Sequence, residues 1–164
     1  TCRHVMHLSA LMAALRDARE EIGSLAEVEI GGGYGNMARL VGRTFGFRGW
    51  TVLDLPFMTR LQGWYLSRAL GARTAFNLDA PQACGDSDGE DQAVCPGEGS
   101  GLEVRLVDTR HLNMWLARGP EADVLVATSS WSELSLDDFY WYYMHVLPRV
   151  RWLLYAYSTV WPSR

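Results

Sequence analysis

We predict an α/β fold with a parallel sheet for this chain of 164 residues. Short apolar runs alternate along it with longer segments in which apolar residues recur every three or four positions. This alternation is typical of strands joined by crossover helices. The length suits a single domain, and 48% hydrophobic with 21% charged residues is the composition of a globular protein with a core.

The first expected element is an amphipathic helix, with apolar residues spaced from Val5 to Ile22 and Gly23 as its stop. We assign residues 1–25 to this N-terminal helix and residues 26–164 to the main domain. Five buried strands are expected at residues 26–30, 50–53, 102–107, 123–127 and 152–157. Helices are expected between them at residues 37–47, 57–70, 111–117 and 136–146. The helix at 57–70 should carry on one side Met58, Leu61, Tyr65, Leu66 and Ala69.

Composition changes abruptly at residues 79–101, where six acidic residues and no arginine lie among glycine, proline and serine. We interpret this segment as an acidic inserted loop. Thirteen acidic residues remain elsewhere against fifteen basic ones, so the net charge of −4 arises in the insert.

Charge and composition argue against several classes of protein. A net charge of −4 disfavours a nucleic-acid partner, because proteins that bind DNA or RNA usually carry a basic face. No apolar run approaches the roughly 18 residues that span a bilayer. All fifteen basic residues are arginine, which excludes a lysine nucleophile or Schiff base. Three scattered cysteines favour a reducing, cytoplasmic setting.

A glycine cluster, Glu-Ile-Gly-Gly-Gly-Tyr-Gly-Asn at residues 29–36, lies between an expected strand and an expected helix. Glycines allow a tight turn and let a ligand approach the backbone closely. Asp54 lies nineteen residues after Gly35, at the end of the next strand, where an acid can accept hydrogen bonds from two ribose hydroxyls. Together these residues predict a ligand that contains adenosine, bound at the carboxyl edge of the sheet.

Two cofactors are compatible with this loop. A dinucleotide such as NAD needs G-x-G-x-x-G/A, which Gly33, Gly35 and Ala38 satisfy. The loop displays more fully the pattern E-x-G-x-G-x-G, from Glu29 to Gly35. This pattern resembles motif I of the class I S-adenosylmethionine-dependent methyltransferases, so we favour S-adenosylmethionine. The resemblance implies a Rossmann-like, doubly wound parallel sheet of the class I methyltransferase type.

Further blocks extend the resemblance over about residues 26–160. They are Asp-Leu-Pro at 54–56, Gln-x-x-Tyr-Leu at 62–66, Ser-Trp-Ser-Glu at 130–133 and Leu-Tyr-Ala-Tyr-Ser at 154–158. In combination with the glycine loop, these blocks are similar to the sugar O-methyltransferase family. Members of that family continue beyond the fifth strand with a helix and an antiparallel hairpin, so the resemblance implies a sheet that lacks its last strands here.

The resemblance also implies the cofactor site. In the family, the leading acid and the glycine loop line the methionine end, the acid after the second strand holds the ribose, and the residue after it packs against adenine. An acid after the third core strand contacts the adenine amino group. Carried over to this chain, with the tyrosine of the loop as a cover, the cofactor residues are Glu29, Gly31, Gly32, Gly33, Tyr34, Gly35, Asp54, Leu55 and Asp108.

Methyl transfer to a hydroxyl needs an aligned acceptor and is helped by a general base. Glu133, shortly after the fourth expected strand, is the first candidate base, with a solvated or helix-capping acid as the alternative. His111 is the second candidate, and a structural histidine is its alternative. The candidate acceptor-binding residues are Gln62, Tyr65 and Trp131. For Gln62 the alternative is an exposed helical glutamine.

These inferences lead us to expect an S-adenosylmethionine-dependent O-methyltransferase that acts on a sugar, a glycan or another small-molecule acceptor. No metal site is expected, because only Glu133, Asp137 and Asp138 lie close enough in sequence to form one. A non-catalytic partner module with the methyltransferase fold is one alternative, and an NAD-dependent oxidoreductase is another. The sequence does not identify the acceptor or the oligomeric state.

Overall fold

The computed structural model describes residues 2–71, 73–76, 102–120, 122–128 and 130–156, and its core is one sheet of six strands. The strands are β1 (Ala26–Ile30), β2 (Gly49–Asp54), β3 (Arg73–Phe76), β4 (Glu103–Asp108), β5 (Val124–Thr128) and β6 (Trp152–Ala156). Their order is β3-β4-β2-β1-β5-β6, and every pairing is parallel. The predicted α/β fold with a parallel sheet is thus confirmed, and it is compatible with a Rossmann-like fold.

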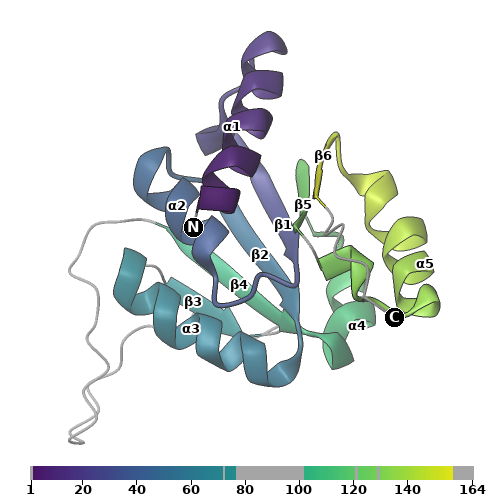
Figure 1. The fold of residues 1–164 in the computed structure, drawn as a ribbon. Coiled ribbons are helices and arrows are strands. Elements are labelled where there is room, and N and C mark those ends of the chain that lie inside the picture. Colours follow the sequence, from purple (N-terminus) through teal and green to yellow (C-terminus); the bar gives the residue numbers. More distant parts are fainter. Residues whose placement is uncertain (1, 72, 77–101, 121, 129, 157–164) are drawn as a thin grey trace, which may run out of the picture.

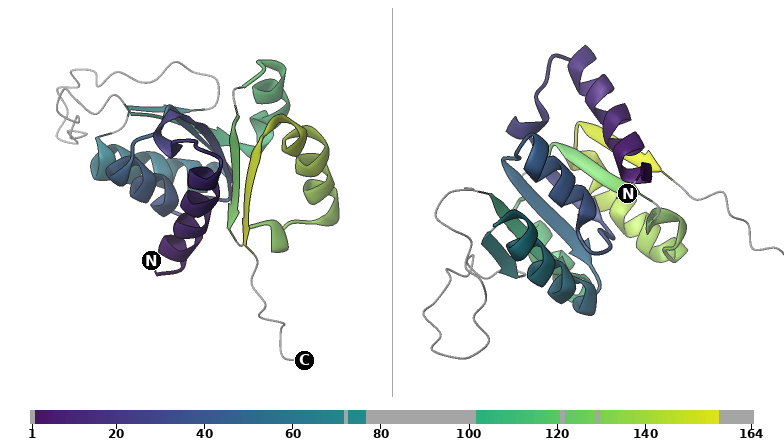
Figure 2. Two further views of the ribbon diagram at one scale, coloured as in Figure 1. Left: turned by 90° about the horizontal axis from the view of Figure 1, so that it is seen from above. Right: turned by 60° about the vertical axis from the view of Figure 1, so that its left-hand side comes forward.

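Helices cover both faces of this sheet (Figures 1 and 2). They are α1 (Cys2–Asp17), α2 (Asn36–Thr44), α3 (Pro56–Leu70), α4 (Leu112–Ala117) and α5 (Leu136–His145). Short 3₁₀ helices lie at Ile22–Ser24, Thr109–His111, Ser130–Ser132 and Leu147–Arg149. The first three helices pack on one face, while α4 and α5 pack on the other. Within the described residues, no helix is both long and apolar enough to cross a bilayer.

The first helix is shorter than its apolar spacing predicts. It ends at Asp17, and Arg19 takes a left-handed φ of 60°. The Glu20 amide then donates back to the Leu15 carbonyl over 2.9 Å, which closes the helix. Ile22 is buried all the same, at 2% exposure, because it begins a 3₁₀ helix and joins the core cluster that contains Leu15 and Leu25. The prediction that one helix reaches Ile22 is therefore wrong.

The sheet also contains a strand that the sequence did not reveal. β3 lies at the edge and pairs with β4 from Arg73↔Glu103 to Phe76↔Leu106. It has only four residues and includes an arginine, so it lacks the apolar run that marks the central strands. The predicted acidic insert at 79–101 lies outside the described residues.

The inward face of α3 differs from the predicted one. Thr59, Gln62 and Gly63 are buried together with Leu66, whereas Leu61 is 45% exposed. The cause is the side chain of Gln62, whose hydrogen bonds lie beneath the helix and turn the polar residue inward. Three apolar side chains of α3 consequently face solvent, namely Phe57, Leu61 and Trp64.

β1 is buried along its whole length, and its side chains alternate between two cores. Val28 and Ile30 join the cluster under α4 and α5. Glu27 and Glu29 therefore point to the opposite face, where α1, α2 and α3 pack. Two carboxyl groups thus lie in the interior on the same side of the central strand.

Of the two carboxyl groups, Glu27 is in the environment that disfavours a negative charge more strongly. It is 1% exposed, and neither of its oxygens has a hydrogen-bond partner of normal geometry among the described residues. Burial raises the pKa of Glu27 to about 9, and the nearby Asp123 carboxylate adds to the shift. The side chain is thus protonated at neutral pH.

We expect this carboxyl group to make stability depend on pH. Between the unfolded pKa of 4.5 and the folded pKa of about 9, the folded state holds a proton that the unfolded state has lost. Stability attributable to Glu27 therefore falls as pH rises through this range, by at most about 1.4 kcal/mol per pH unit. Urea denaturation should show that Glu27→Gln removes this slope. The exposed Glu133→Gln serves as the control, and parallel pH curves for wild type and Glu27→Gln would contradict the prediction.

Candidate functional site

The carboxyl ends of the central strands bring most of the predicted site residues to one edge of the sheet. β1 lies between β2 and β5, and the chain leaves it toward β2 before returning on its other side as β5. In open α/β sheets, ligands bind in the crevice outside such a switch point. The loops after β1, β2, β4 and β5 all end at this edge (Figure 1).

The glycine turn after β1 is tied to both neighbouring strands. The Gly31 amide donates to the Leu53 carbonyl over 2.9 Å, and Gly31 has a left-handed φ of 65°. A Cβ atom on Gly31 would lie 2.5 Å from the Cβ of Ser130, whose hydroxyl donates to the Ile30 carbonyl. Only glycine fits here, because the loop after β5 presses against the turn.

The middle of the turn, at Gly33 and Tyr34, opens toward solvent, whereas Gly35 is buried against Leu66. Gly33 has a φ of 56°, and a Cβ atom there would meet nothing within 4 Å. Gly35, with a φ of 94°, precedes the first residue of α2, and its amide donates to the Gly32 carbonyl over 2.9 Å. The turn thus exposes backbone at Gly33, next to the amino end of a nine-residue helix.

Glu29 lies directly beneath this turn. Its side chain is 2% exposed, and Oε2 accepts a hydrogen bond of 3.0 Å from the Trp50 indole. A Cβ atom on Gly32 would lie 3.1 Å from the same carboxylate. Burial raises the pKa of Glu29 to about 7, and the Asp54 carboxylate adds to the shift. The turn therefore rests on a carboxyl group that titrates near neutral pH.

Asp54 ends β2 and is joined to the glycine turn by Gln62. The Gln62 amide nitrogen donates to Oδ2 of Asp54 over 2.6 Å and to the Gly33 carbonyl over 2.7 Å. The Leu55 amide donates to Oδ1 over 2.7 Å. Asp54 is 9% exposed, and burial raises the pKa of its carboxyl group above the usual value. The carboxylate is therefore held in place before any ligand arrives.

Gln62 is 0% exposed, so the alternative of an exposed helical glutamine is wrong. Its amide bridges two parts of the candidate cofactor site. No sequence pattern indicated this bridge, since Gln62 lies 29 residues from Gly33. Its predicted contact with an acceptor stays a prediction.

Asp108 lies beside Asp54 in the sheet register and forms a compact cluster with the residues that follow it. It is 3% exposed, and its oxygens accept from the Arg110 guanidinium at 2.9 and 3.2 Å and from the Arg110 amide at 3.0 Å. His111 Nδ1 lies 2.9 Å from Oδ1. These contacts, led by Arg110, hold the pKa of Asp108 well below its usual range. The predicted contact of Asp108 with an adenine amino group stays a prediction.

The pairing with Asp108 also orients His111. Nδ1 is engaged by the carboxylate, which leaves Nε2 as the ring nitrogen for a further partner. His111 is half-buried and precedes α4. The sequence proposed it as a base without indicating its carboxylate partner.

Aromatic and apolar side chains frame the open part of the turn. Tyr34 is 44% exposed and meets Tyr65 edge to face, with ring centroids 5.1 Å apart. Leu55, the residue before α3, is 48% exposed and is accessible to a flat ring bound next to Asp54.

The two predicted site residues after β5 differ in exposure. Trp131 is 8% exposed and packs against Phe139 and Tyr155 at centroid distances of 5.4 Å, so it belongs to the core under α5. Its Nε1 has no hydrogen-bond partner among the described residues, and its predicted acceptor contact stays a prediction. Glu133 is exposed at the end of the same loop.

The cavity at the other edge of the sheet is not lined by the predicted site residues. This cavity of about 220 Å³ opens at the amino edge, where Arg48, Arg105 and Trp115 are among the lining residues. In the part of the chain that the structure describes, no three His, Cys, Asp or Glu side chains gather as metal ligands would.

Comparisons with models of protein families, with characterised proteins and with solved structures give no match. The structure itself defines an α/β protein with an all-parallel, six-stranded sheet. A glycine turn lies at the switch point of this sheet, at the carboxyl end of β1. This arrangement is compatible with a Rossmann-like fold.

Proposed function

We propose that this protein binds S-adenosylmethionine at the carboxyl edge of its sheet and methylates a hydroxyl oxygen of a sugar or glycan. The observation that carries the proposal is Asp54, held at the end of β2 by Gln62, which also bonds the exposed glycine turn. A fixed carboxylate beside open backbone is the arrangement that a ribose and its attached chain require. The residues present thus suit an adenosine ligand.

The carboxyl group of Glu29 favours S-adenosylmethionine over NAD. A dinucleotide would place two negative charges of its pyrophosphate on the glycine turn. Glu29 lies directly beneath that turn, and its negative form would repel them. The methionine part of S-adenosylmethionine instead carries positive sulfonium and ammonium groups, which a carboxylate attracts. When bound, this cofactor supplies an activated methyl group.

Strand order suggests how the chain's residues divide the work. With a ribose on Asp54, adenine would extend past Leu55 toward Asp108 at the end of β4, and the methionine end toward β1 and β5. Glu133 follows β5 and is on the side of the methyl group, whereas His111 follows β4 and is on the side of adenine. Glu133 is therefore the better placed residue to take the proton of the acceptor hydroxyl. Tyr34, which is exposed and supported by the partly buried Tyr65, can pack against a sugar ring.

Calorimetric titration tests the cofactor directly. We expect S-adenosylhomocysteine to bind with a micromolar dissociation constant, about −8 kcal/mol, and NADH to bind much more weakly. Tighter binding of NADH would indicate an oxidoreductase, and binding of neither ligand by a chain shown to be folded would remove the proposal. Where S-adenosylhomocysteine binds, incubation with S-adenosylmethionine and sugar acceptors, followed by mass spectrometry, tests transfer. Cofactor binding without transfer to any acceptor would favour the non-catalytic module.

A further inference from the structure

The outward face of α3 has an unusual composition. All of its exposed positions are large apolar residues or arginines, namely Phe57, Arg60, Leu61, Trp64 and Arg68. At about 100° per residue these five positions fall within one side of the helix, opposite the buried residues. Phe57, Leu61 and Trp64 are 67%, 45% and 57% exposed, so they form an apolar stripe along the helix. We call these five residues the α3 face.

The helix next to α3 adds further positive charge. Arg43 of α2 donates to the carbonyl of Ala69 on α3 at 2.7 and 3.0 Å, and Arg39 donates to the side-chain oxygen of Asn36. Both acceptors are neutral, so the arginine charges are not cancelled. Neither α2 nor α3 contains an aspartate or a glutamate. The two helices α2 and α3 together thus carry four arginines and no acidic residue.

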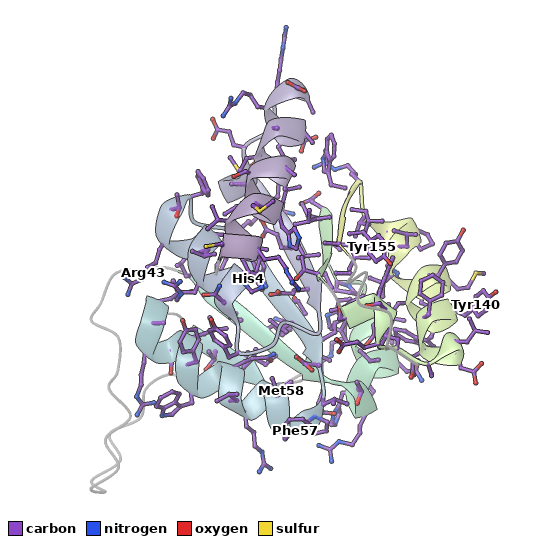
Figure 3. All side chains as sticks on the ribbon, viewed as in Figure 1. His4, Arg43, Phe57, Met58, Tyr140 and Tyr155 are labelled. Atoms are coloured by element: carbon purple, nitrogen blue, oxygen red, sulfur yellow. The ribbon has the colours of Figure 1, made fainter. Side chains whose placement is uncertain are left out.

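The exposed apolar residues of α5 offer an instructive contrast on the opposite side of the sheet. Tyr140 and Met144 are 54% and 63% exposed, but Asp137 and Asp138 lie among them on the same helix. Figure 3 shows Phe57 and Arg43 on the side of α2 and α3, and Tyr140 on α5 across the sheet. Exposed apolar area is thus found on both sides; among these three helices, α2 and α3 combine it with arginines and no acidic residue, whereas α5 combines it with aspartates.

We propose that the α3 face docks on the surface of an anionic lipid bilayer. Phenylalanine, leucine and tryptophan enter the boundary between headgroups and acyl chains, and neighbouring arginines attract anionic headgroups. The Arg68 guanidinium lies 4.6 Å from the centre of the Trp64 ring, so charge and apolar surface already occur side by side. The helix lies in the plane of the surface and does not cross the bilayer.

Docking in this way has a consequence for the edge of the sheet. α3 begins two residues after Asp54, so Phe57 lies at the end of the helix nearest the candidate cofactor site. A docked chain would keep that site close to the lipid headgroups. The inference depends only on the α3 face, and it stands whether or not the chain transfers methyl groups.

Vesicle flotation tests the proposal with the full chain. We expect binding to vesicles of phosphatidylcholine with one-third phosphatidylserine, weaker binding to phosphatidylcholine alone, and release at high salt. Leu61→Ser combined with Trp64→Ser should weaken binding about tenfold or more. Arg60→Gln and Arg68→Gln should each weaken it about fivefold. These side chains are exposed, so the variants should stay folded, which circular dichroism checks.

Tyr140→Ser combined with Met144→Ser removes a similar exposed area from α5 and is the matched control; it should bind vesicles like the wild type. Three outcomes would overturn the proposal. They are failure of the folded wild type to bind anionic vesicles at low salt, equal losses in the α3 and α5 variants, and self-association through the α3 face without vesicle binding. The last outcome, seen by sedimentation, would identify a second copy of the chain as the occupant.

Discussion

Asp54→Ala is expected to weaken the binding of S-adenosylhomocysteine at least tenfold, about 1.4 kcal/mol or more. The structure holds this aspartate ready at the end of β2, with one oxygen fixed by Gln62 and the other by the Leu55 amide. Its removal leaves two ribose hydroxyls without a charged acceptor in a largely buried place, which costs about 1.5–3 kcal/mol per lost hydrogen bond to a charge. Isothermal titration calorimetry of the two proteins measures the difference.

Two further variants make this result interpretable. Asp137→Ala removes an exposed carboxylate from α5 and should leave the affinity unchanged. Gln62→Leu keeps Asp54 but deletes its link to Gly33, and we expect an intermediate loss of affinity. If Asp54→Ala binds S-adenosylhomocysteine as tightly as the wild type does, the ligand does not lie at the end of β2.

Gly31→Ala is expected to destabilise the fold by about 2–5 kcal/mol. A left-handed backbone costs a residue with a Cβ atom about 1–2 kcal/mol, and φ at Gly31 is 65°. The new methyl group would also lie 2.5 Å from the Cβ of Ser130, and relieving such overpacking costs about 1–3 kcal/mol more. Urea denaturation, followed by circular dichroism, measures the free energy of unfolding.

Gly33→Ala is the matched control, because φ is also positive there but the space around it is open. It should lose only the backbone part, about 1–2 kcal/mol. Adding Ser130→Gly to Gly31→Ala removes the opposing Cβ atom and should restore part of the lost stability. Equal losses for Gly31→Ala and Gly33→Ala would show that the loop after β5 does not press on the turn.

The central strands were predictable because they are buried on both faces. The first strand matches its predicted bounds, residues 26–30, since an apolar run there ends in glycine. Helix ends and orientations were harder. α1 stops at Asp17 because of a left-handed turn at Arg19, which periodicity does not reveal. On α3, a polar residue turns inward and Leu61 outward, so hydrophobicity alone indicated the wrong face.

The candidate site also contains residues that the sequence could predict and residues whose roles it could not. Residues that follow directly from strand ends, such as Glu29 and Asp54, could be located from sequence because parallel strands bring their carboxyl ends together. The hydrogen-bonding roles of Gln62 and Ser130 could not be predicted, since their partners lie 29 and 100 residues away. Their roles follow from tertiary packing, which no local pattern records.

The contact between Ser130 and the glycine turn sets an order of events during folding. The first strand pairs with a neighbour that follows about a hundred residues later, so a long loop must close before the turn is complete. The early half of the chain carries Glu29, the glycines and Asp54, but the turn is unsupported until β5 joins the sheet. On a ribosome, the nascent chain therefore completes the support of its glycine turn only after residues near 130 have emerged.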